Sequence, residues 1–145
     1  MNEALQIKEI EGEIVEEFSL FDNWDDKYEY IIDLGKKLPP LEAQYKKDDN
    51  KVRGCQSTVW LAGEYKDGKI FYKADSDAVI VKGLISMLIR VLSGQTPDSI
   101  VAAPLDFIKA IGMTNHLAQT RSNGLMAMVK QMKAYALAYK LKHAI

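Results

Sequence analysis

The single cysteine, Cys55, is the residue best suited to covalent chemistry in this 145-residue sequence. It lies in Lys51-Val52-Arg53-Gly54-Cys55-Gln56-Ser57, where a polar loop gives way to a β-branched, apolar stretch. A thiol reacts as its thiolate, and nearby cations such as Lys51 and Arg53 lower its pKa from a reference value of about 8.5. Gly54 lets the backbone turn tightly beside the sulfur. A reactive site is one interpretation; a buried structural cysteine is the other, because free cysteines are among the most buried residues.

Two other residues, His116 and Asn123, follow Cys55 in the order Cys, His, Asn that papain-like cysteine hydrolases use. The sequence holds only two histidines, and the spacing lacks the local signatures of those hydrolases. Helix capping or packing is therefore the favoured interpretation of His116 and Asn123, and hydrolysis is kept as an alternative.

A single cysteine excludes several kinds of site. No intrachain disulfide can form, and an iron–sulfur cluster or a structural zinc site normally needs about four ligands, which Cys55, His116 and His143 do not reach. The sequence has no phosphate-binding loop, since Gly94, Gly112 and Gly124 stand alone. We therefore expect this chain to bind no metal and no cofactor.

The composition is that of an ordinary globular protein, with 48% hydrophobic and 27% charged residues. Its net charge of −1 argues against a nucleic-acid-binding protein that relies on bulk charge. The first 20 residues are acidic where a signal peptide would be basic and then apolar, and the longest apolar run, residues 78–92, is interrupted by polar residues and too short to span a membrane. We expect a cytoplasmic protein with one domain over residues 1–145.

Charge is distributed unevenly along the chain. Residues 1–33 hold eleven acids and two bases, whereas no acid follows Asp106 and six cations do. The favoured interpretation is that acidic first helices pack beside a basic last helix. The alternative is a surface of one sign that docks a partner.

The elements that position Cys55 follow from periodicity and turn signals. Helical spacing of apolar residues predicts helices over residues 4–20 and 24–38, the second capped by Asn23 and stopped by Pro39-Pro40. Residues 42–53 are polar and predict an exposed loop. Strands are expected over residues 57–65 and 70–74 around an Asp67-Gly68 turn, with a short third strand near Val52.

The remaining chain predicts helices. Residues 78–93 are apolar nearly all round and form a buried central helix, with Lys82 and Arg90 reaching solvent. Asp75-Ser76-Asp77 is expected to cap it. Two short helices follow, at Thr96-Pro97-Asp98 and over residues 105–111, and a long one spans residues 120–142. Trp24 and Trp60 are assigned to the core. The predicted class is α+β, with a small antiparallel sheet of two to three strands packed against several helices.

Four stretches together resemble the SufE family of cysteine-desulfuration proteins. They are Asn23-Trp24-Asp25-Asp26-Lys27-Tyr28 through Leu34-Gly35, Gly54-Cys55-Gln56-Ser57-Thr58-Val59-Trp60, residues 75–84 beginning Asp75-Ser76-Asp77, and His116-Leu117 followed by Arg121-Ser122-Asn123-Gly124-Leu125. The resemblance spans roughly residues 18–140. The segment Ala118-Gln119-Thr120 departs from the Ser-Pro-Ser expected before the arginine, and we interpret it as a changed helix cap.

The resemblance implies a SufE/IscU-like fold and a sulfur relay. Such a protein accepts sulfur as a persulfide on one cysteine, here Cys55, from a pyridoxal-phosphate cysteine desulfurase that it stimulates. It then passes the sulfur to an iron–sulfur scaffold complex (SufBCD-like). The cofactor belongs to the desulfurase, and no nucleic acid or membrane is implied.

Supporting roles follow as hypotheses. Gly54 shapes the loop, Gln56 and Ser57 offer hydrogen bonds to the sulfur, His116 and Arg121 place positive charge near it or hold the loop, and Asp77 lies on the docking surface. At rest the loop is expected to hold Cys55 against apolar residues, which suppresses oxidation.

Three other functions compete with a sulfur relay: a Cys-His-Asn hydrolase or transferase acting alone, a binding module with a structural cysteine, and a thiol peroxidase that borrows an external thiol. The sequence leaves open which desulfurase and acceptor are used, the resting burial of Cys55, the oligomeric state, and whether the sulfur serves clusters only.

Overall fold

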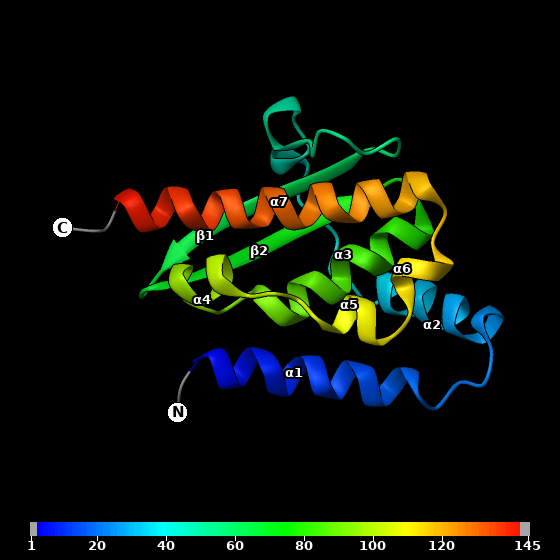
Figure 1. The fold of residues 1–145 in the computed structure, drawn as a ribbon. Helices are drawn as coiled ribbons and strands as arrows, with labels where there is room; N and C mark the ends of the chain where they lie inside the picture. The colour runs from blue at the N-terminus through cyan, green and yellow to red at the C-terminus, as the bar shows by residue number, and fades with distance from the viewer. Residues whose placement is uncertain (1–2, 143–145) are drawn as a thin grey trace.

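The computed structural model describes residues 3–142, and its sheet is one antiparallel hairpin (Figure 1). Strands β1 (Val59–Lys66) and β2 (Lys69–Ser76) pair in register from Val59↔Ser76 to Lys66↔Lys69. Asp67 and Gly68 both have positive φ, which confirms the expected turn. Both strands lie close to their predicted ranges. The predicted α+β class with a small antiparallel sheet is confirmed.

The prediction of a short third strand near Val52 was wrong. Lys51 forms one isolated bridge with Trp60, and the Val52 amide donates to the Val59 carbonyl at 2.9 Å. The pairing stops there because the chain turns at Gly54, whose φ of 95° no strand can hold. Before it, the loop predicted over residues 42–53 contains two 3₁₀ turns, η1 (Ala43–Tyr45) and η2 (Asp48–Asn50).

The buried central helix α3 (Val79–Leu92) crosses α2 (Trp24–Lys36) at very short range. A Cβ on Gly83 would lie 2.0 Å from the Ile31 carbonyl oxygen, so only glycine permits this approach. Helix α3 also packs against β2 and α7 (Gln119–Lys142), and its nine buried residues form the centre of the core.

The long helix α7 lies along the hairpin and α4 (Pro97–Ala102), and the short helices α5 (Phe107–Ala110) and α6 (Met113–His116) lead into it (Figure 1). The short helix α6 was not predicted. Leu125, Val129, Met132 and Ala136 form the buried seam of α7, and Tyr139 is partly buried beside it.

Hydrogen bonds satisfy carbonyls and amides on both outer edges of the hairpin. On β1, the hydroxyls of Tyr135 and Tyr139 donate to the carbonyls of Leu61 and Gly63, at 3.2 and 3.1 Å. On β2, the amide of Tyr72 donates to Ser93 Oγ at 2.9 Å, and the amide of Ile70 donates to the Gln95 carbonyl. Helix α7 therefore contributes polar contacts to the sheet as well as apolar ones.

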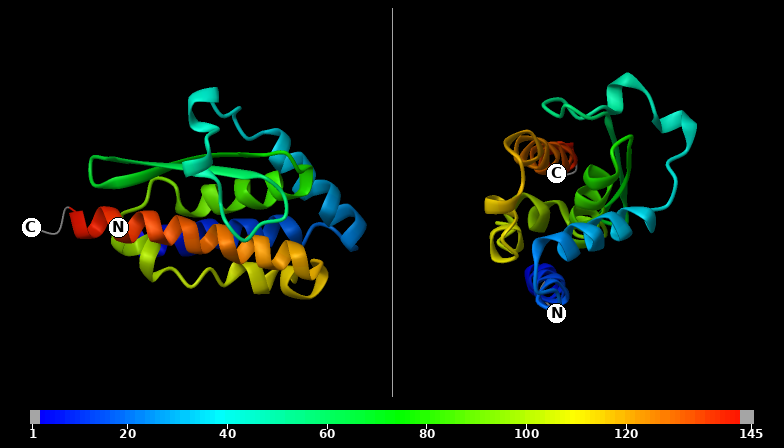
Figure 2. Two further views of the ribbon diagram at one scale, coloured as in Figure 1. Left: turned by 90° about the horizontal axis from the view of Figure 1, so that it is seen from above. Right: turned by 90° about the vertical axis from the view of Figure 1, so that its right-hand side faces the viewer.

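The acidic helix α1 (Glu3–Phe18) does not lie beside the basic α7. It contacts α3, α4 and α5, and two views place it on the opposite side of the molecule from α7 (Figures 1 and 2). Its acids pair with α3 instead: Arg90 contacts Glu13 and Glu17 at 3.3 and 2.6 Å. The hydrogen bonds from Arg90 lower the pKa of Glu17 to about 2. Arg90 is therefore held in ion pairs, contrary to the expectation that it extends freely to solvent.

Candidate functional site

Cys55 lines a cavity of about 320 Å³ between the loop that carries it and two helices. Helix α3 and the residue before it supply Ala78, Ile80 and Val81, and α7 supplies Leu125 and Met128, all apolar. The polar lining residues are Gln56, Ser57, Thr120 and Arg121. The cavity lining thus combines apolar side chains with polar ones, among them one cation, Arg121, that is exposed to solvent.

The Cys55 thiol is turned inward and is partly buried. Its Sγ donates to the Gly124 carbonyl at 3.5 Å. A Cβ on Gly124 would lie 3.5 Å from that sulfur, so the absent side chain leaves space beside it. Burial raises the pKa of the Cys55 thiol above its ordinary value. The flanking cations do not lower it as expected; Lys51 pairs with Asp48 at 3.1 Å, and Arg53 is exposed.

Residues 53–57 form a short loop between two fixed ends. At one end the Val52 amide donates to Val59, and at the other Thr58 and Asp77 exchange two hydrogen bonds of 3.1 and 3.2 Å. Within the described chain, the only long-range hydrogen bond from residues 53–57 is the weak one from Cys55 to Gly124. The loop is therefore anchored firmly at its ends and lightly at its centre.

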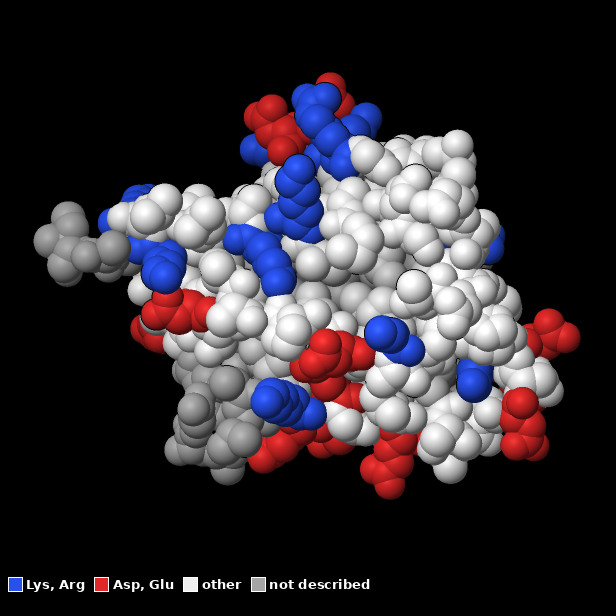
Figure 3. All heavy atoms as spheres, viewed as in Figure 1, with Lys and Arg blue, Asp and Glu red and all other residues white. Residues whose placement is uncertain are grey.

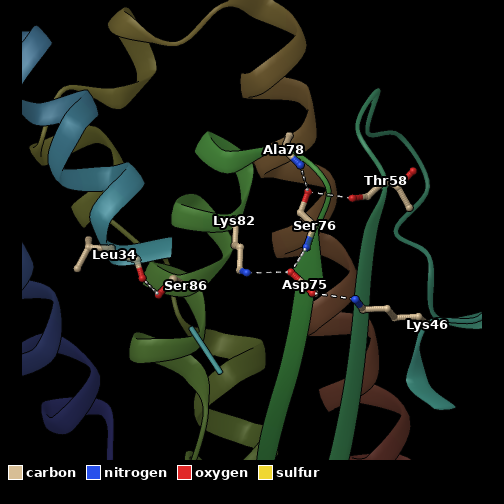
Figure 4. A network of polar contacts seen from close by, with 8 residues as sticks. All are labelled: Leu34, Lys46, Thr58, Asp75, Ser76, Ala78, Lys82 and Ser86. Atoms are coloured by element: carbon tan, nitrogen blue, oxygen red, sulfur yellow. Dashed lines mark hydrogen bonds and ion pairs between the residues drawn. The ribbon is translucent and has the colours of Figure 1, made fainter. Parts of the chain in front are cut away.

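A polar network holds the second anchor in place (Figure 4). Asp75 is buried and contacts Lys46 at 3.2 Å and Lys82 at 3.3 Å, while the Ser76 amide donates to it at 2.8 Å. Burial alone would raise the pKa of Asp75, but these three partners outweigh it and lower that pKa. Ser76 Oγ donates to the Thr58 carbonyl at 2.9 Å, which links the network to the Cys55 loop.

This network differs from the helix cap predicted for Asp75-Ser76-Asp77. Helix α3 begins after Ala78 without a side-chain cap, and all three residues bind other elements or one another instead. Lys82, expected in solvent, is held by Asp75. The side chain of Asp77 is exposed and accepts from the Thr58 amide, so it positions the loop end, and a docking role stays a prediction.

The structure brings some of the proposed site residues together and separates others. Cys55, Gln56, Ser57 and Arg121 share the cavity, and Gly54 turns against α7, where a Cβ on it would lie 3.3 Å from Ala127. In the described structure the cavity lining does not include His116 or Asn123.

His116 has other contacts. Its ring stacks on Trp24 with centroids 4.3 Å apart, and its carbonyl accepts a hydrogen bond from the Tyr28 hydroxyl. Asn123 accepts from Gln119 at 2.9 Å. These contacts are those of packing and helix-surface residues, the interpretation favoured from the sequence. Trp24 and Trp60, assigned to the core, are only partly buried.

Sequence reasoning missed the α7 residues that form the cavity wall, above all Gly124. A glycine inside a long helix costs about 1 kcal/mol relative to alanine, and this cost was the one local signal at the position. Leu125 and Met128 carried no separate signal, because apolar residues on the buried seam of a helix serve packing in any fold.

The described residues show no sign of a metal centre or a membrane span. Nowhere in residues 3–142 do three His, Cys, Asp or Glu side chains come together as a group that could hold a metal ion. None of the helices in that range is long and apolar enough to cross a bilayer.

Comparison with known proteins identifies the fold and the family. The family model described as "SufE: Fe-S metabolism associated domain" matches residues 12–136. The chain belongs to the SufE family. This membership assigns the protein to iron–sulfur metabolism, in which SufE proteins work with a cysteine desulfurase.

Relatives from distant organisms agree with this assignment. An uncharacterised SufE-like protein of Synechocystis is 41% identical over 130 residues, covering 90% of this chain and 82% of that protein. The chloroplastic/mitochondrial SufE-like protein 1 of Arabidopsis thaliana is 38% identical over 131 residues, covering 90% of this chain and 35% of that longer protein.

A solved structure supports the fold. The solution structure of a hypothetical protein from Thermus thermophilus matches with a TM-score of 0.73 over 89% of this chain and 94% of that one. At 19% sequence identity, this likeness supports the SufE fold alone.

Proposed function

We propose that this SufE protein accepts sulfur from a cysteine desulfurase as a persulfide on Cys55 and passes it to an iron–sulfur scaffold complex. The observation that carries the proposal is the position of the chain's only cysteine, on a lightly held loop at the wall of a partly apolar cavity. In this role Cys55 is the sulfur carrier, and the reaction takes place only with a partner. Pyridoxal phosphate is the desulfurase's cofactor, and the relay itself needs none on this chain.

Sulfur transfer is a thiol exchange. The Cys55 thiol gives up its proton, and the thiolate attacks the terminal sulfur of the desulfurase persulfide. A new bond forms between Cys55 Sγ and that sulfur, the donor's sulfur–sulfur bond breaks, and the donor cysteine leaves as a thiolate. The carried sulfur keeps its oxidation state, so no external oxidant or reductant is needed.

The cavity supports a protected resting state. A persulfide adds one sulfur about 2.05 Å beyond Sγ, and the cavity of about 320 Å³ has room for it. Burial keeps the free thiol protonated and therefore slow to react with oxidants. The chain holds no second cysteine that could attack the persulfide and expel the sulfur.

The loop supports delivery as well. Cys55 is three residues along the chain from the anchor at Val52, and an extended chain spans about 3.3 Å per residue, so an outward-turned Cys55 reaches about 10 Å from the anchors. That movement breaks one weak hydrogen bond, from Cys55 to Gly124, and leaves the anchors at Val52 and Thr58 in place. Contacts with the partner must favour the outward state.

Arg121 is the supporting residue with the clearest position. It lines the cavity, is exposed, and makes no hydrogen bond or ion pair within the described chain. A free guanidinium there can stabilise the thiolate or the persulfide anion. Gln56 and Ser57 line the same cavity and can donate hydrogen bonds to sulfur.

The deciding experiment is intact-mass measurement after the protein is mixed with a cysteine desulfurase and cysteine. We expect a gain of one or more sulfur atoms that a thiol reductant removes and that Cys55→Ala abolishes. Sulfur acceptance that survives in Cys55→Ser would instead support a binding module with a structural cysteine. Turnover of a thioester or peptide by this protein alone would support the hydrolase. We place the relay in the cytoplasm.

A further inference from the structure

The lining of the Cys55 cavity carries one charged side chain, and that charge has no partner. Among the described residues, Arg121 is the only charged residue in the lining, and its guanidinium makes no ion pair or hydrogen bond within residues 3–142. Asp77, which precedes the lining residue Ala78, lies outside the lining and accepts a hydrogen bond from the Thr58 amide. The cavity therefore favours a small anion, and a guanidinium binds a carboxylate through two parallel hydrogen bonds.

The size and the rest of the lining suit a molecule about as large as an amino acid. The cavity of about 320 Å³ is at the lower end of the range of about 300–1,000 Å³ for small-molecule sites. The hydroxyls of Ser57 and Thr120 and the amide of Gln56 can bind polar atoms of a ligand. The apolar side chains of α3 and α7 suit its hydrocarbon and sulfur atoms.

A small molecule can approach Cys55 while the loop is at rest. The Cys55 sulfur is turned toward Gly124 and faces the cavity, where only a small molecule fits. A second cavity, of about 510 Å³, shares Arg121 and two apolar residues with the first and is also lined by Val79, which is 64% exposed. Because Arg121 and Val79 are both open to solvent, entry beside them requires no outward movement of the loop.

We propose that this cavity binds a small persulfide that carries a carboxylate, as the persulfide of free cysteine does, and that Cys55 takes sulfur from it without a desulfurase. The inference rests on the proposed function, because it keeps Cys55 as the sulfur carrier and adds a second donor. Arg121 holds the carboxylate, and the persulfide end of the donor extends along the apolar side chains toward Cys55.

The transfer is a balanced thiol exchange. The Cys55 thiol loses its proton, and its sulfur attacks the terminal sulfur of the donor; the bond between the two donor sulfurs breaks, and the donor leaves as a thiolate that takes up a proton. The products are the Cys55 persulfide and a small thiol, so no external oxidant or reductant is consumed. Because burial raises the pKa of Cys55, little of it is thiolate at neutral pH, and binding of the carboxylate compensates by holding the donor beside the sulfur.

The test compares two donors that differ in the carboxylate. The purified protein, with no desulfurase present, is mixed with the persulfide of cysteine or with that of cysteamine, which lacks the carboxylate. Sulfur on Cys55 is followed over time as a gain in intact mass that a thiol reductant removes. The ratio of the two rates in the protein unfolded in urea gives the intrinsic difference between the donors.

The folded protein should raise this ratio at least about tenfold, since the carboxylate gains a charge-assisted hydrogen bond. Arg121→Gln should return the ratio to its unfolded value, and Arg121→Lys should retain part of the increase because it keeps the charge. The matched control is Arg53→Gln, which alters an exposed arginine of the Cys55 loop that does not line the cavity and should leave the ratio unchanged.

A second pair of reagents tests carboxylate recognition apart from sulfur transfer. Iodoacetate and iodoacetamide both alkylate Cys55 and differ only in carrying a carboxylate or a neutral amide. The ratio of their rates should show the same dependence on folding and on Arg121.

Each outcome decides the inference. Equal ratios in the folded and unfolded protein overturn it, as does an equal loss in Arg121→Gln and Arg53→Gln. A preference lost equally in Arg121→Gln and Arg121→Lys also overturns it, because the donor then does not bind to the positive charge. Sulfur gained on Cys55 only from a desulfurase overturns this inference and leaves the proposed function standing. Sulfur gained from the cysteine persulfide and never from a desulfurase contradicts the proposed function and supports this inference.

Discussion

Cys55 combines a low resting reactivity with a position that needs only a small movement to change it. Its thiol is partly buried, bound to a carbonyl and held by burial above its ordinary pKa. A carrier exposed at all times would react with any oxidant it met. The environment of the Cys55 sulfur therefore slows its reaction with oxidants in free solution, as the proposed sulfur transfer to a bound partner requires.

The pH dependence of Cys55 alkylation tests this environment. A raised pKa means that the folded protein holds its thiol proton where the unfolded chain has lost it. The alkylation rate should rise about tenfold per pH unit and level off above the ordinary thiol pKa of about 8.5, because burial raises the pKa of Cys55 in the folded protein. The protein unfolded in urea should level off near that ordinary pKa. Stability should also fall as pH rises through this range. A folded-state midpoint at or below the unfolded one contradicts the assignment.

Gly124→Ala tests the effect of this glycine on the stability of α7 and on the reactivity of Cys55. Alanine removes the cost of a helical glycine, so the melting temperature should rise, by up to about 1 kcal/mol in stability. The new methyl group would lie 3.5 Å from Sγ, an ordinary van der Waals contact, so Cys55 should keep its position and alkylate at the unaltered rate. Faster alkylation in the variant would contradict this and show that Cys55 needs the space that Gly124 leaves.

At the scale of elements, the Cys55 loop depends on contacts between segments distant in sequence. Asp75 on β2 joins Lys46 from the loop after α2 to Lys82 on α3, and Ser76 and Asp77 bind Thr58. The buried carboxylate of Asp75 therefore holds in place the anchor of the Cys55 loop at Thr58.

Asp75→Asn should loosen that anchor and destabilise the fold. We expect a loss of about 1–3 kcal/mol in urea unfolding at neutral pH, since a buried charged hydrogen-bond acceptor is removed. Because the pKa of Asp75 lies below 3.8 in the folded state, its contribution is present above that pH and is lost as pH falls through the folded value. The difference from the unaltered protein should therefore shrink in acid. The control is Asp48→Asn at an exposed pair with Lys51, with an effect within about 0.5 kcal/mol.

Local patterns predicted the elements well and their long-range polar partners poorly. The all-round apolar character of residues 79–92 has one physical solution, a buried helix, and Asp67-Gly68 has few backbone alternatives. Asp75 lies before a helix and matches a cap, yet its two lysines are 29 residues before it and seven after it. Local sequence patterns therefore favour a helix cap for Asp75, because they do not reveal ion-pair partners so far along the chain.

Only part of the candidate site was predictable from the sequence as well. Cys55, with its two neighbours, was found from residue type and resemblance, and Arg121 from resemblance alone. The wall at Gly124 and Met128 depends on how α7 packs over the loop, which periodicity does not reveal. His116 matched a hydrolase order in the sequence, but its stacking on Trp24 follows from the path of the chain through α6, a helix that was not predicted.

At the scale of the whole molecule, acidic and basic helices lie on opposite sides, with the Cys55 cavity at one end of the basic helix (Figures 1 and 3). A charge-separated surface orients an approaching partner before contact and speeds association at low salt. The proposed relay would then couple docking to exposure of the sulfur, because only a correctly oriented partner could favour the outward loop.

Partner-dependent alkylation tests that coupling. Cys55 should react slowly alone and several-fold faster with a desulfurase whose own active-site cysteine has been replaced, so that no sulfur is transferred. The acceleration should weaken at high salt, because ions screen the attraction between charged surfaces. Equal alkylation rates with and without the desulfurase would contradict the proposed coupling between docking and exposure of Cys55.

The hydroxyls of Tyr135 and Tyr139 have an effect beyond the packing of α7. An open strand edge is a template on which other chains can add as strands, and a two-stranded ribbon has two such edges. By occupying carbonyls along β1, these hydroxyls make the ribbon a poor seed for fibrils. Under the proposed relay, the loop beside β1 could therefore be released and recaptured many times without assembly into insoluble polymers.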